Sequence, residues 1–311
     1  MTAPFVQLKF EALPEKPRVP HPFFEAEERR VPVWTEALGD TVASVRVMGS
    51  GPPLMLVHGL MTTGYTFRYV MEPLARDFTV YVPDLPGGGR TEAPDRPLTP
   101  FALADWLDTL QQALRIQGCP VIGNSMGGYL CMWWALRHPR SIERLVVVHA
   151  PTYPMRKLYA LWPVIRMPGA RRLLRRLVQA DTERWAHRNV HYYDETLKSR
   201  EETREYGGHL KTDAGLAGFH AQLRDAMDVR RVRELWKHLA SRHEDGCDFP
   251  MPLQLIYARN DPMVPGWVGR ALSERLPAAE LVYLEHASHF AHVDNPDVFL
   301  PPVRRFLGAP A

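Results

Sequence analysis

Apolar residues occur along this chain in two patterns, short continuous runs and longer stretches with helical spacing. Continuous runs bounded by turn residues indicate strands that are covered on both faces of a sheet. Their alternation with helical stretches is typical of a mostly parallel sheet flanked by helices, with right-handed crossovers. Runs of this kind predict strands at residues 54–57, 78–82, 143–149, 253–258 and 281–284, and one more that ends at Ile122.

The same patterns predict a hairpin and the helices that cover the sheet. Residues 31–38 and 41–48 are two candidate strands, and Gly39 and Asp40 between them are typical of a hairpin turn. Helical spacing predicts helices at residues 66–76, 100–117, 126–137, 267–276 and 296–307.

Two regions depart from this alternation. Residues 1–30 are polar and rich in proline, which indicates an extended arm. Residues 151–246 are helical in pattern and contain no convincing buried strand. We therefore expect an N-terminal arm (1–30), one α/β core (31–150 and 247–311) and a helical insertion (151–246) within it.

The composition narrows the class of protein. The chain has 311 residues, 45% of them hydrophobic, and a formal net charge of +3, which is too small to indicate a nucleic-acid partner. Its three cysteines lack the spacing of a metal site or a disulfide framework. We see neither a signal-peptide pattern nor an apolar run of membrane-spanning length. A cytoplasmic protein is the expectation, and we expect no metal or cofactor.

The candidate chemistry begins at the segment GNSMGG, residues 123–128, which lies between a predicted strand and a predicted helix. A serine at the apex of such a sharp turn sits in a strained backbone conformation. Side chains two residues before and after it would clash, so glycine is needed there. The start of the following helix favours negative charge that develops near the serine. This context predicts that Ser125 is a nucleophile.

A serine hydroxyl needs an imidazole to accept its proton and a carboxylate to orient that imidazole. In a parallel sheet, functional side chains gather at the carboxyl ends of the strands. Asp261 follows the strand predicted at 253–258, and His289 lies in the loop after the strand at 281–284. The order along the chain is Ser125, Asp261, His289.

At this point the sequence resembles the α/β-hydrolase family, which has this order of nucleophile, acid and histidine. Besides GNSMGG, the similar motifs are His58-Gly59, the D-x-P-G-x-G segment at 84–89, the N-D-P-x-V-P segment at 260–265, and SHFAHVDNP at 288–296. The resemblance covers residues from about 31 to the C-terminus. It implies an eight-stranded sheet with a helical cap inserted after strand six, where residues 151–246 lie.

The resemblance also implies roles for individual residues. Ser125 would be the nucleophile, His289 the general base and then acid, and Asp261 the orienting carboxylate. Backbone N–H groups of Leu60 and Met126 would form the oxyanion hole.

Several other residues compete for these roles. His286 lies very close to a strand end and His292 in the turn before the last helix, so both are weaker candidates for the base. His58 and Asp84 are expected to support their loops. His149 could line the substrate pocket, or it could be a buried histidine that hydrogen-bonds to backbone.

The insertion carries both apolar and basic residues. Tyr153, Met155, Tyr159 and Trp162 could line an apolar acyl pocket or could belong to the cap's own core. The insertion has 19 Lys and Arg against 13 Asp and Glu. In the helix at 171–178, arginines flank leucines. The favoured interpretation is a cap helix with packed leucines and solvated arginines; contact with acidic substrates or a membrane surface is the alternative.

We therefore expect a serine carboxylesterase that acts on a small-molecule ester through an acyl-enzyme. One alternative is a carbon–carbon bond hydrolase of the meta-cleavage-product type, in which Arg184 or Arg188 could bind a substrate carboxylate. Another is a non-catalytic ligand-binding protein on a hydrolase scaffold. The natural substrate and the oligomeric state do not follow from the sequence.

Overall fold

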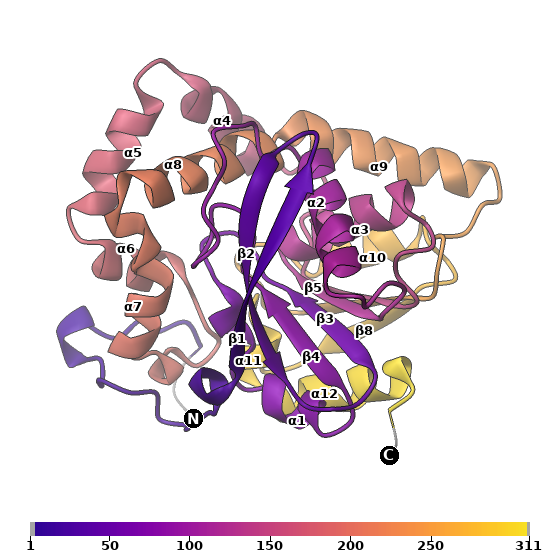
Figure 1. Ribbon diagram of the computed structural model, residues 1–311, viewed down its shortest axis with the longest axis horizontal. Helices are drawn as coiled ribbons and strands as arrows, with labels where there is room; N and C mark the ends of the chain where they lie inside the picture. Colours follow the sequence, from indigo (N-terminus) through magenta and orange to yellow (C-terminus); the bar gives the residue numbers. More distant parts are fainter. Residues whose placement is uncertain (1–3, 310–311) are drawn as a thin grey trace.

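The computed structural model describes residues 4–309 and contains one eight-stranded sheet (Figure 1). The strand order is β1-β2-β4-β3-β5-β6-β7-β8. This confirms the predicted α/β architecture with a mostly parallel sheet. The strands are β1 (Glu27–Thr35), β2 (Gly39–Met48), β3 (Pro53–Val57), β4 (Thr79–Pro83), β5 (Val121–Asn124), β6 (Leu145–Val148), β7 (Leu253–Ala258) and β8 (Glu280–Leu284).

Only β2 runs antiparallel to its neighbours, β1 and β4, and the other strand pairs in the sheet are parallel. The hairpin turn differs from the prediction. Gly39 already pairs with Thr35, so the turn consists of residues 36–38. The backbone N–H of Leu38 donates to Thr35 Oγ1 at 3.2 Å and closes this turn. The Thr35 hydroxyl therefore stabilises the hairpin turn, which lies just before the Gly39-Asp40 pair that was predicted to form it.

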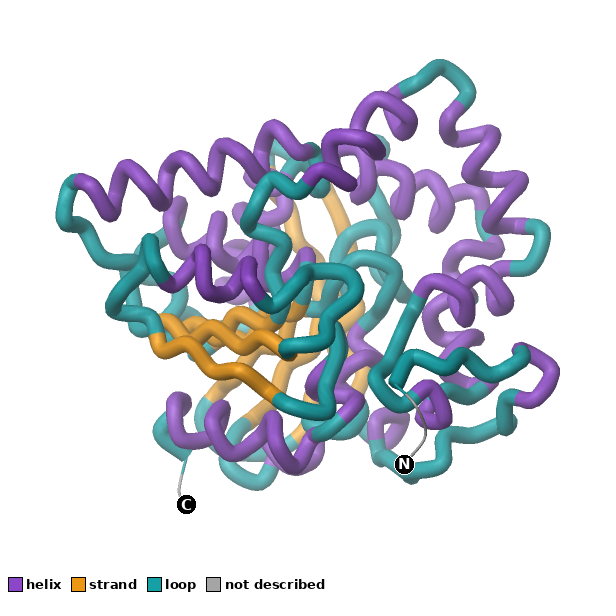
Figure 2. Tube along the Cα trace, turned by 180° about the vertical axis from the view of Figure 1, so that it is seen from behind, coloured by secondary structure: helices purple, strands orange, loops and turns teal. Residues whose placement is uncertain are grey.

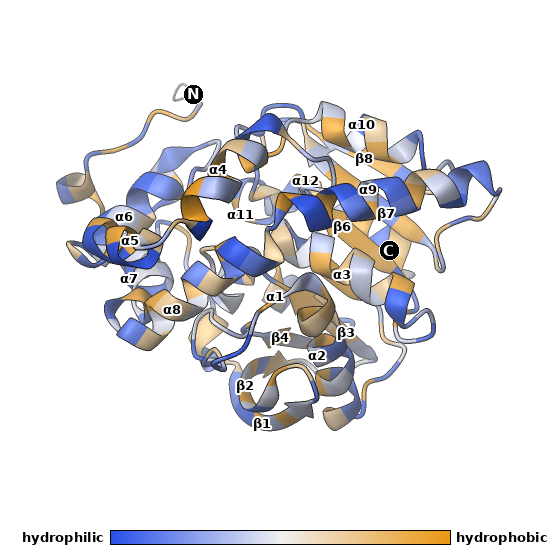
Figure 3. Ribbon diagram, turned by 90° about the horizontal axis from the view of Figure 1, so that it is seen from above, coloured by the Kyte–Doolittle hydropathy of each residue, from blue (hydrophilic) through white to orange (hydrophobic). Residues whose placement is uncertain are grey.

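Helices cover both faces of the sheet. The apolar side chains of α2, α3, α9 and α10 belong to one buried cluster, and those of α1, α11 and α12 belong to the other. In Figure 3 the central strands are hydrophobic and the helices outside them alternate between polar and apolar turns. The bounds are α1 (Met71–Ala75), α2 (Pro100–Ala113), α3 (Met126–Arg137), α9 (Val229–Glu244), α10 (Trp267–Ser273), α11 (Ala291–Asp294) and α12 (Pro296–Leu307).

The helix predicted at 66–76 is broken into two short pieces. A 3₁₀ turn, η3, spans Gly64–Phe67, and α1 begins only at Met71. Pro73, in the first turn of α1, has no N–H to donate to the carbonyl of Tyr69 four residues earlier, so α1 cannot extend back from Met71 into the preceding turn. The helix predicted at 100–117 ends at Ala113, and that at 267–276 ends at Ser273. The helix predicted at 296–307 has the same bounds in the structure.

The insertion between β6 and β7 is helical, as expected. Figure 1 shows α5 to α8 as a layer at one side of the sheet, and Figure 2 shows the same layer from behind. α9 differs from the helices before it, because Val232, Leu235 and Leu239 on it are buried in the core cluster. The helices of the cap proper are α4 (Arg156–Arg166), α5 (Ala170–Gln179), α6 (Thr182–Asn189), α7 (Arg200–Gly207) and α8 (Asp213–Ala221).

The N-terminal arm is extended apart from two 3₁₀ turns, η1 (Phe10–Ala12) and η2 (Phe23–Glu25). It is shorter than the predicted 1–30, because residues 27–30 already pair with β2 as part of β1. It lies against the cap. The backbone carbonyls of Pro14 and Glu15 accept from the N–H groups of Arg200 and Glu201 at 2.8 and 3.0 Å. The arm therefore holds the start of α7. Residues 1–3 of the predicted arm lie outside the described residues.

Candidate active site

Ser125 stands at the turn between β5 and α3, with φ 55° and ψ −123°. A positive φ is strained for a residue with a side chain. The surroundings require glycine on both sides. A Cβ on Gly123 would lie 2.7 Å from the Cα of Gly128, and one on Gly127 would lie 2.3 Å from the carbonyl oxygen of Val57. The structure thus contains the tight strand–serine–helix turn that the GNSMGG segment predicts.

Asp261 lies in the loop that follows β7 and is buried. Its Oδ1 accepts from the backbone N–H groups of Met263 and Val264 at 2.6 and 2.9 Å. Burial opposes ionisation of this carboxyl. The imidazoles of His289 and His149 outweigh burial and hold the pKa of Asp261 well below its usual range. The group is therefore an anion near neutral pH, as an orienting carboxylate must be.

His289 lies in the loop between β8 and α11. Its Nδ1 is 2.7 Å from Oδ2 of Asp261, which fixes the ring. In the neutral ring that donates this hydrogen bond from Nδ1, the other nitrogen, Nε2, is free to accept a proton. Ser125 and His289 line the same cavity. The structure therefore brings together the three residues that the sequence selects for nucleophile, acid and base.

The competing histidines are occupied elsewhere. Nε2 of the buried His292 lies 2.9 Å from Oγ1 of Thr66. Nδ1 of His286 lies 3.2 Å from the Tyr193 hydroxyl, in an exposed position. Neither ring contacts Asp261 among the hydrogen bonds of residues 4–309.

His58 and Asp84 support their loops, as the sequence predicts. Nε2 of His58 accepts from the N–H of Leu85 at 2.9 Å. The carboxylate of Asp84 accepts from the N–H groups of Gly64 and Arg90, both at 2.8 Å. Both side chains therefore fix the backbone that borders the site.

His149 is fully buried at the end of β6 and is not among the residues that line the cavity with Ser125. Its Nε2 accepts from the N–H of Ala258 at 3.2 Å, so the backbone contact weighed in the sequence is present. Its Nδ1 lies 2.8 Å from Oδ2 of Asp261, a contact that the sequence reasoning missed. Burial lowers the pKa of His149 more than the Asp261 carboxylate raises it, so the ring is neutral near pH 7.

The cluster of His149, Asp261 and His289 also has the composition of a metal site, because its ligand atoms lie within 4.8 Å of one another. Its nitrogens already have other partners. Nδ1 of His289 donates to Asp261, and Nε2 of His149 accepts from a backbone N–H. An ion bound between these atoms would displace the hydrogen bond that orients His289. The arrangement suits a hydrogen-bonded catalytic unit better than a metal centre.

The two backbone groups expected to form an oxyanion hole lie beside Ser125. Leu60 and Met126 both line the cavity with it. The loop before Leu60 passes very close to the serine, since a Cβ on Gly59 would lie 2.8 Å from the Ser125 Cβ. Within residues 4–309, neither the Leu60 nor the Met126 N–H donates to another backbone group. Both donors are available to a charge that develops at this point.

The cavity at Ser125 has a volume of about 280 Å³ and a mostly apolar lining. Met155, one of the four apolar residues suggested for an acyl pocket, lines it. Lys157 and Asn189 join Ser125 and His289 as its polar side chains. The other apolar residues of the lining include Met61, Leu158, Leu161, Val190, Met227 and Phe290.

The other suggested pocket residues lie elsewhere. Tyr153 packs edge-on against Trp236 and Trp267, with ring centroids 4.9 Å apart in each pair. Trp162 lies under the guanidinium of Arg230, 4.9 Å from the ring centroid, and Tyr159 is exposed. Tyr153 and Trp162 therefore pack against α9 and α10, and Tyr159 lies on the surface of α4.

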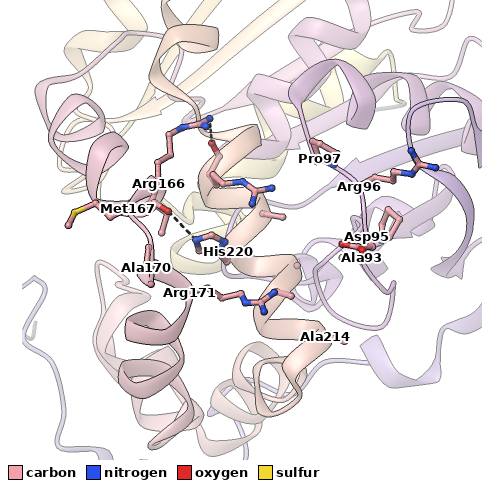
Figure 4. A pocket seen from close by; sticks show the side chains of 17 residues that line it. Ala93, Asp95, Arg96, Pro97, Arg166, Met167, Ala170, Arg171, Ala214 and His220 are labelled. Atoms are coloured by element: carbon pink, nitrogen blue, oxygen red, sulfur yellow. Dashed lines mark hydrogen bonds between the residues drawn. The ribbon is translucent and has the colours of Figure 1, made fainter.

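A larger cavity, of about 630 Å³, lies between the cap and the core loop at residues 93–97. Figure 4 shows Arg166, Arg171 and His220 on its cap side and Arg96 on its core side. None of the three candidate catalytic residues lines it. We therefore place the candidate chemistry in the smaller, apolar cavity.

Named relatives of this chain include an ester hydrolase and a carbon–carbon bond hydrolase. The pimeloyl-[acyl-carrier protein] methyl ester esterase of Aeromonas salmonicida is 28% identical over 273 residues, which cover 85% of this chain and 99% of that protein. The 2-hydroxymuconate semialdehyde hydrolase of a Pseudomonas species is 27% identical over 269 residues, covering 83% and 88%.

Solved structures show the same fold. An esterase of Thermogutta terrifontis superposes with a TM-score of 0.71 at 19% identity, over 91% of this chain and 98% of that one. A family model described as the alpha/beta hydrolase fold matches residues 52–296. With the fold, the family match and the strand-end residues in agreement, this chain belongs to the α/β-hydrolase family.

Proposed function

We propose that this protein is a serine hydrolase that cleaves carboxylic esters through an acyl-enzyme intermediate. The observation that carries the proposal is the hydrogen bond of 2.7 Å between His289 Nδ1 and Asp261, in a site whose cavity is shared by His289 and Ser125. A base oriented in this way can activate a serine hydroxyl. No residue beyond the chain's own is needed for this chemistry.

The steps follow from the positions of the groups. His289 Nε2 takes the proton of Ser125 as Oγ attacks the ester carbonyl. The N–H groups of Leu60 and Met126 donate to the oxyanion, each contributing about 3 kcal/mol to the transition state. His289 then gives its proton to the departing alcohol, which leaves an acyl group on Ser125. Water, activated by His289, attacks the acyl carbonyl and releases the carboxylic acid and free Ser125.

The cavity lining supports small to medium apolar esters. Methionine, leucine, valine and phenylalanine side chains surround the serine, and Lys157 is the cation among the residues that line the cavity. A pocket of this character stabilises hydrocarbon groups by removing them from water. The esterase relative from Aeromonas salmonicida acts, by its name, on a methyl ester. It supports an ester as the substrate class.

Carbon–carbon bond hydrolysis is a second candidate, because other relatives are named 2-hydroxymuconate semialdehyde hydrolase and 2-hydroxy-6-oxo-2,4-heptadienoate hydrolase. A substrate of that kind carries a carboxylate. Arg184, suggested as its partner, instead pairs with Glu11 and Asp181 at 2.7 and 3.3 Å. Neither Arg184 nor Arg188 lines the cavity. Lys157 is the lining residue that could receive such a carboxylate.

The experiment is hydrolysis of p-nitrophenyl esters of graded acyl length by the native protein and by Ser125→Ala. We expect activity that disappears with the serine and an acyl-length optimum set by the cavity. 2-Hydroxy-6-oxo-2,4-heptadienoate is tested in parallel.

The other outcomes separate the alternatives. Turnover of the dienoate without turnover of any ester would replace the proposal with carbon–carbon hydrolysis. Labelling of Ser125 by a fluorophosphonate would then show that the nucleophile is competent. Ligand retention without any turnover or labelling would favour a binding protein.

A further inference from the structure

The first two cap helices have an unusual composition. Residues 156–180, which include α4 and α5, contain seven lysines and arginines and no aspartate or glutamate. We call this segment the α4–α5 surface. Elsewhere the chain has 31 basic and 35 acidic residues, so the positive charge of the protein is concentrated here.

The same segment exposes apolar side chains. Of the 13 large hydrophobic residues that are exposed in the described part of the chain, six lie between residues 159 and 177. Met167, Leu173 and Leu177 are 60, 55 and 62% exposed. Single exposed apolar residues are common on protein surfaces, but a cluster of this kind marks an interaction site. The other three are Tyr159, Leu161 and Val164.

α5 shows how the two properties combine. Val178 is buried, and Leu174 packs against the small cap cluster that contains Val178. Leu173 and Leu177 point to solvent, one turn apart, and arginines 172 and 176 directly precede them in sequence. The favoured expectation, that the leucines pack and only the arginines are solvated, therefore holds for Leu174 and is wrong for Leu173 and Leu177.

The arginines are largely without acidic partners. Among the described residues, Arg171, Arg172 and Arg176 form no ion pair, and Arg175 lies 3.5 Å from the exposed Asp213. Arg166 is paired with Asp228 at 2.8 Å. Unpaired arginines beside exposed leucines form a surface that is complementary to a layer with negative headgroups and an apolar interior.

We propose that the α4–α5 surface binds a lipid bilayer that contains anionic phospholipids. Leucines 173 and 177 insert among the acyl chains, and the arginines of α5 contact phosphate groups. No helix within residues 4–309 is long and apolar enough to span a membrane, so the contact is peripheral. This inference goes beyond the proposed hydrolysis and does not depend on it.

Other occupants fit the surface less well. If a second copy of the chain bound through its own α4–α5 surface, seven basic residues would face seven basic residues, and the segment has no acidic residue to offset their repulsion. Leu173, Leu177 and Val164 line none of the four cavities that adjoin α4 and α5 in the described part of the chain, so these three side chains offer no groove to a peptide or helix. Side chains that project singly are suited to insertion into a fluid interface.

The surface is continuous with the candidate active site. Leu161 is both exposed and part of the cavity lining, and Lys157 and Leu158 on the same helix also line the cavity. The larger cavity in Figure 4 adjoins the middle of the segment, where α4 ends and α5 begins, and its lining includes Arg166 and Arg171. A bilayer on this face would therefore lie next to the entrance of the apolar cavity.

The test is co-sedimentation of the Ser125→Ala protein with vesicles, so that no ester in the lipid is cleaved. One set of vesicles is phosphatidylcholine alone and the other is phosphatidylcholine with phosphatidylglycerol. We expect binding to the second set only, weakened as the salt concentration rises. The double change Arg172→Glu and Arg176→Glu should reduce partitioning at least about tenfold.

Replacing both exposed leucines, Leu173→Ser and Leu177→Ser, should also reduce partitioning about tenfold, because their insertion is lost. Matched controls remove equivalent groups elsewhere. Arg233→Glu with Lys237→Glu reverses two exposed charges on α9, and Trp34→Ser with Val42→Ser removes two exposed apolar groups on the hairpin. Both controls should bind as the parent protein does.

Several results would overturn the proposal. These are absence of binding to both vesicle sets, binding that the leucine changes leave intact, and loss of binding in the control variants. Binding to poly-glutamate without binding to vesicles would also overturn it and would identify the face as a dock for an acidic protein. Hydrolysis of p-nitrophenyl esters in solution is measured separately, so failure here leaves the proposed function untouched.

Discussion

The Nδ1 atom of His149 lies 2.8 Å from Oδ2 of Asp261, the oxygen that also accepts the hydrogen bond from His289 at 2.7 Å. Nε2 of His149 accepts from the backbone N–H of Ala258, so the proton of this neutral ring is on Nδ1, the nitrogen that lies near the carboxylate. A serine triad needs one imidazole at its carboxylate. Here a second imidazole, that of His149, interacts with the same carboxylate oxygen.

This relationship predicts a pH effect. In His149→Asn the carboxylate loses one of the groups that lower the pKa of Asp261, so it becomes more basic and holds the protonated form of His289 more strongly. The acid limb of kcat/KM should move to higher pH, and kcat/KM at its optimum should fall about tenfold. Asparagine tolerates the positive φ of 51° at this position.

The pH profile separates positioning from simple packing. Lys157, Tyr257 and His292, which are titratable groups near this cluster, are unchanged in the variant. If kcat/KM fell equally at every pH while the acid limb stayed in place, His149 would be a structural residue only. Thermal unfolding of both proteins checks that the variant folds.

Asp261→Asn should lower kcat by about 10⁴-fold, because the amide removes the charge that stabilises the protonated base and favours the wrong tautomer of His289. The asparagine carbonyl can still accept from the backbone N–H of Met263, so the loop should persist. Steady-state hydrolysis of a p-nitrophenyl ester measures the effect. A loss of less than about tenfold would show that another carboxylate orients His289.

The strand pattern and the motifs together predicted where the three residues of the candidate triad lie, because each of them follows a strand of the sheet. Ser125, Asp261 and His289 follow β5, β7 and β8, and the carboxyl ends of parallel strands meet at one edge. His149 follows β6 at the same edge. Its contact with Asp261 was missed because the direction of its ring depends on a left-handed backbone conformation that the sequence does not display.

The cap was the least predictable region. Tyr153 and Trp162 were apolar candidates for a pocket, but they pack against Trp236 and Arg230 of α9 instead. Which side of an amphipathic helix meets solvent depends on its neighbours. Leu173 and Leu174 are neighbours in the sequence, and the helical pattern of α5 does not show which of them is buried. Leu174 is covered because it packs against the small cluster that α8 helps to form, whereas Leu173 is exposed.

Asp294 supplies a second pH-dependent prediction. Its carboxylate accepts from the N–H groups of Ser288 and Tyr193 at 2.6 and 2.7 Å and so joins the histidine loop to the cap. Burial raises the pKa of Asp294 to about 7 against the effect of these hydrogen bonds. The folded protein therefore holds a proton there that the unfolded chain releases near pH 4. Stability should fall as the pH rises from about 4 through 7, by up to about 4 kcal/mol.

Urea unfolding of the native protein and of Asp294→Asn across this pH range tests the assignment. Asparagine does not titrate, so the fall in stability between pH 5 and 7.5 should be smaller in the variant. An unchanged pH slope would assign the titration to another buried group. The variant should keep most of its esterase activity, because Asp294 does not contact His289 among the described hydrogen bonds.

The buried pair of Arg68 and Glu202 joins the core to the cap and gives the final prediction. Arg68 lies between η3 and α1, Glu202 lies in α7, and Nη2 of Arg68 is 2.7 Å from Oε2 of Glu202. Tyr192 donates to the same oxygen at 2.7 Å. Burial raises the pKa of Glu202 even though Arg68 opposes this, so the ionised form of Glu202 depends on the positive charge of Arg68. Arg68→Met should cost about 3–5 kcal/mol of unfolding free energy.

The pair can be separated from the loss of packing by a second change. Glu202→Gln in the Arg68→Met background removes the unpaired charge and should recover part of the lost stability. Arg29→Met is the matched control, because its partner Glu27 lies at 2.8 Å on the surface and such pairs contribute less than about 1 kcal/mol. If the double variant were no more stable than Arg68→Met, the cost would come from the packing of the arginine side chain among Tyr65, Tyr69 and Tyr192.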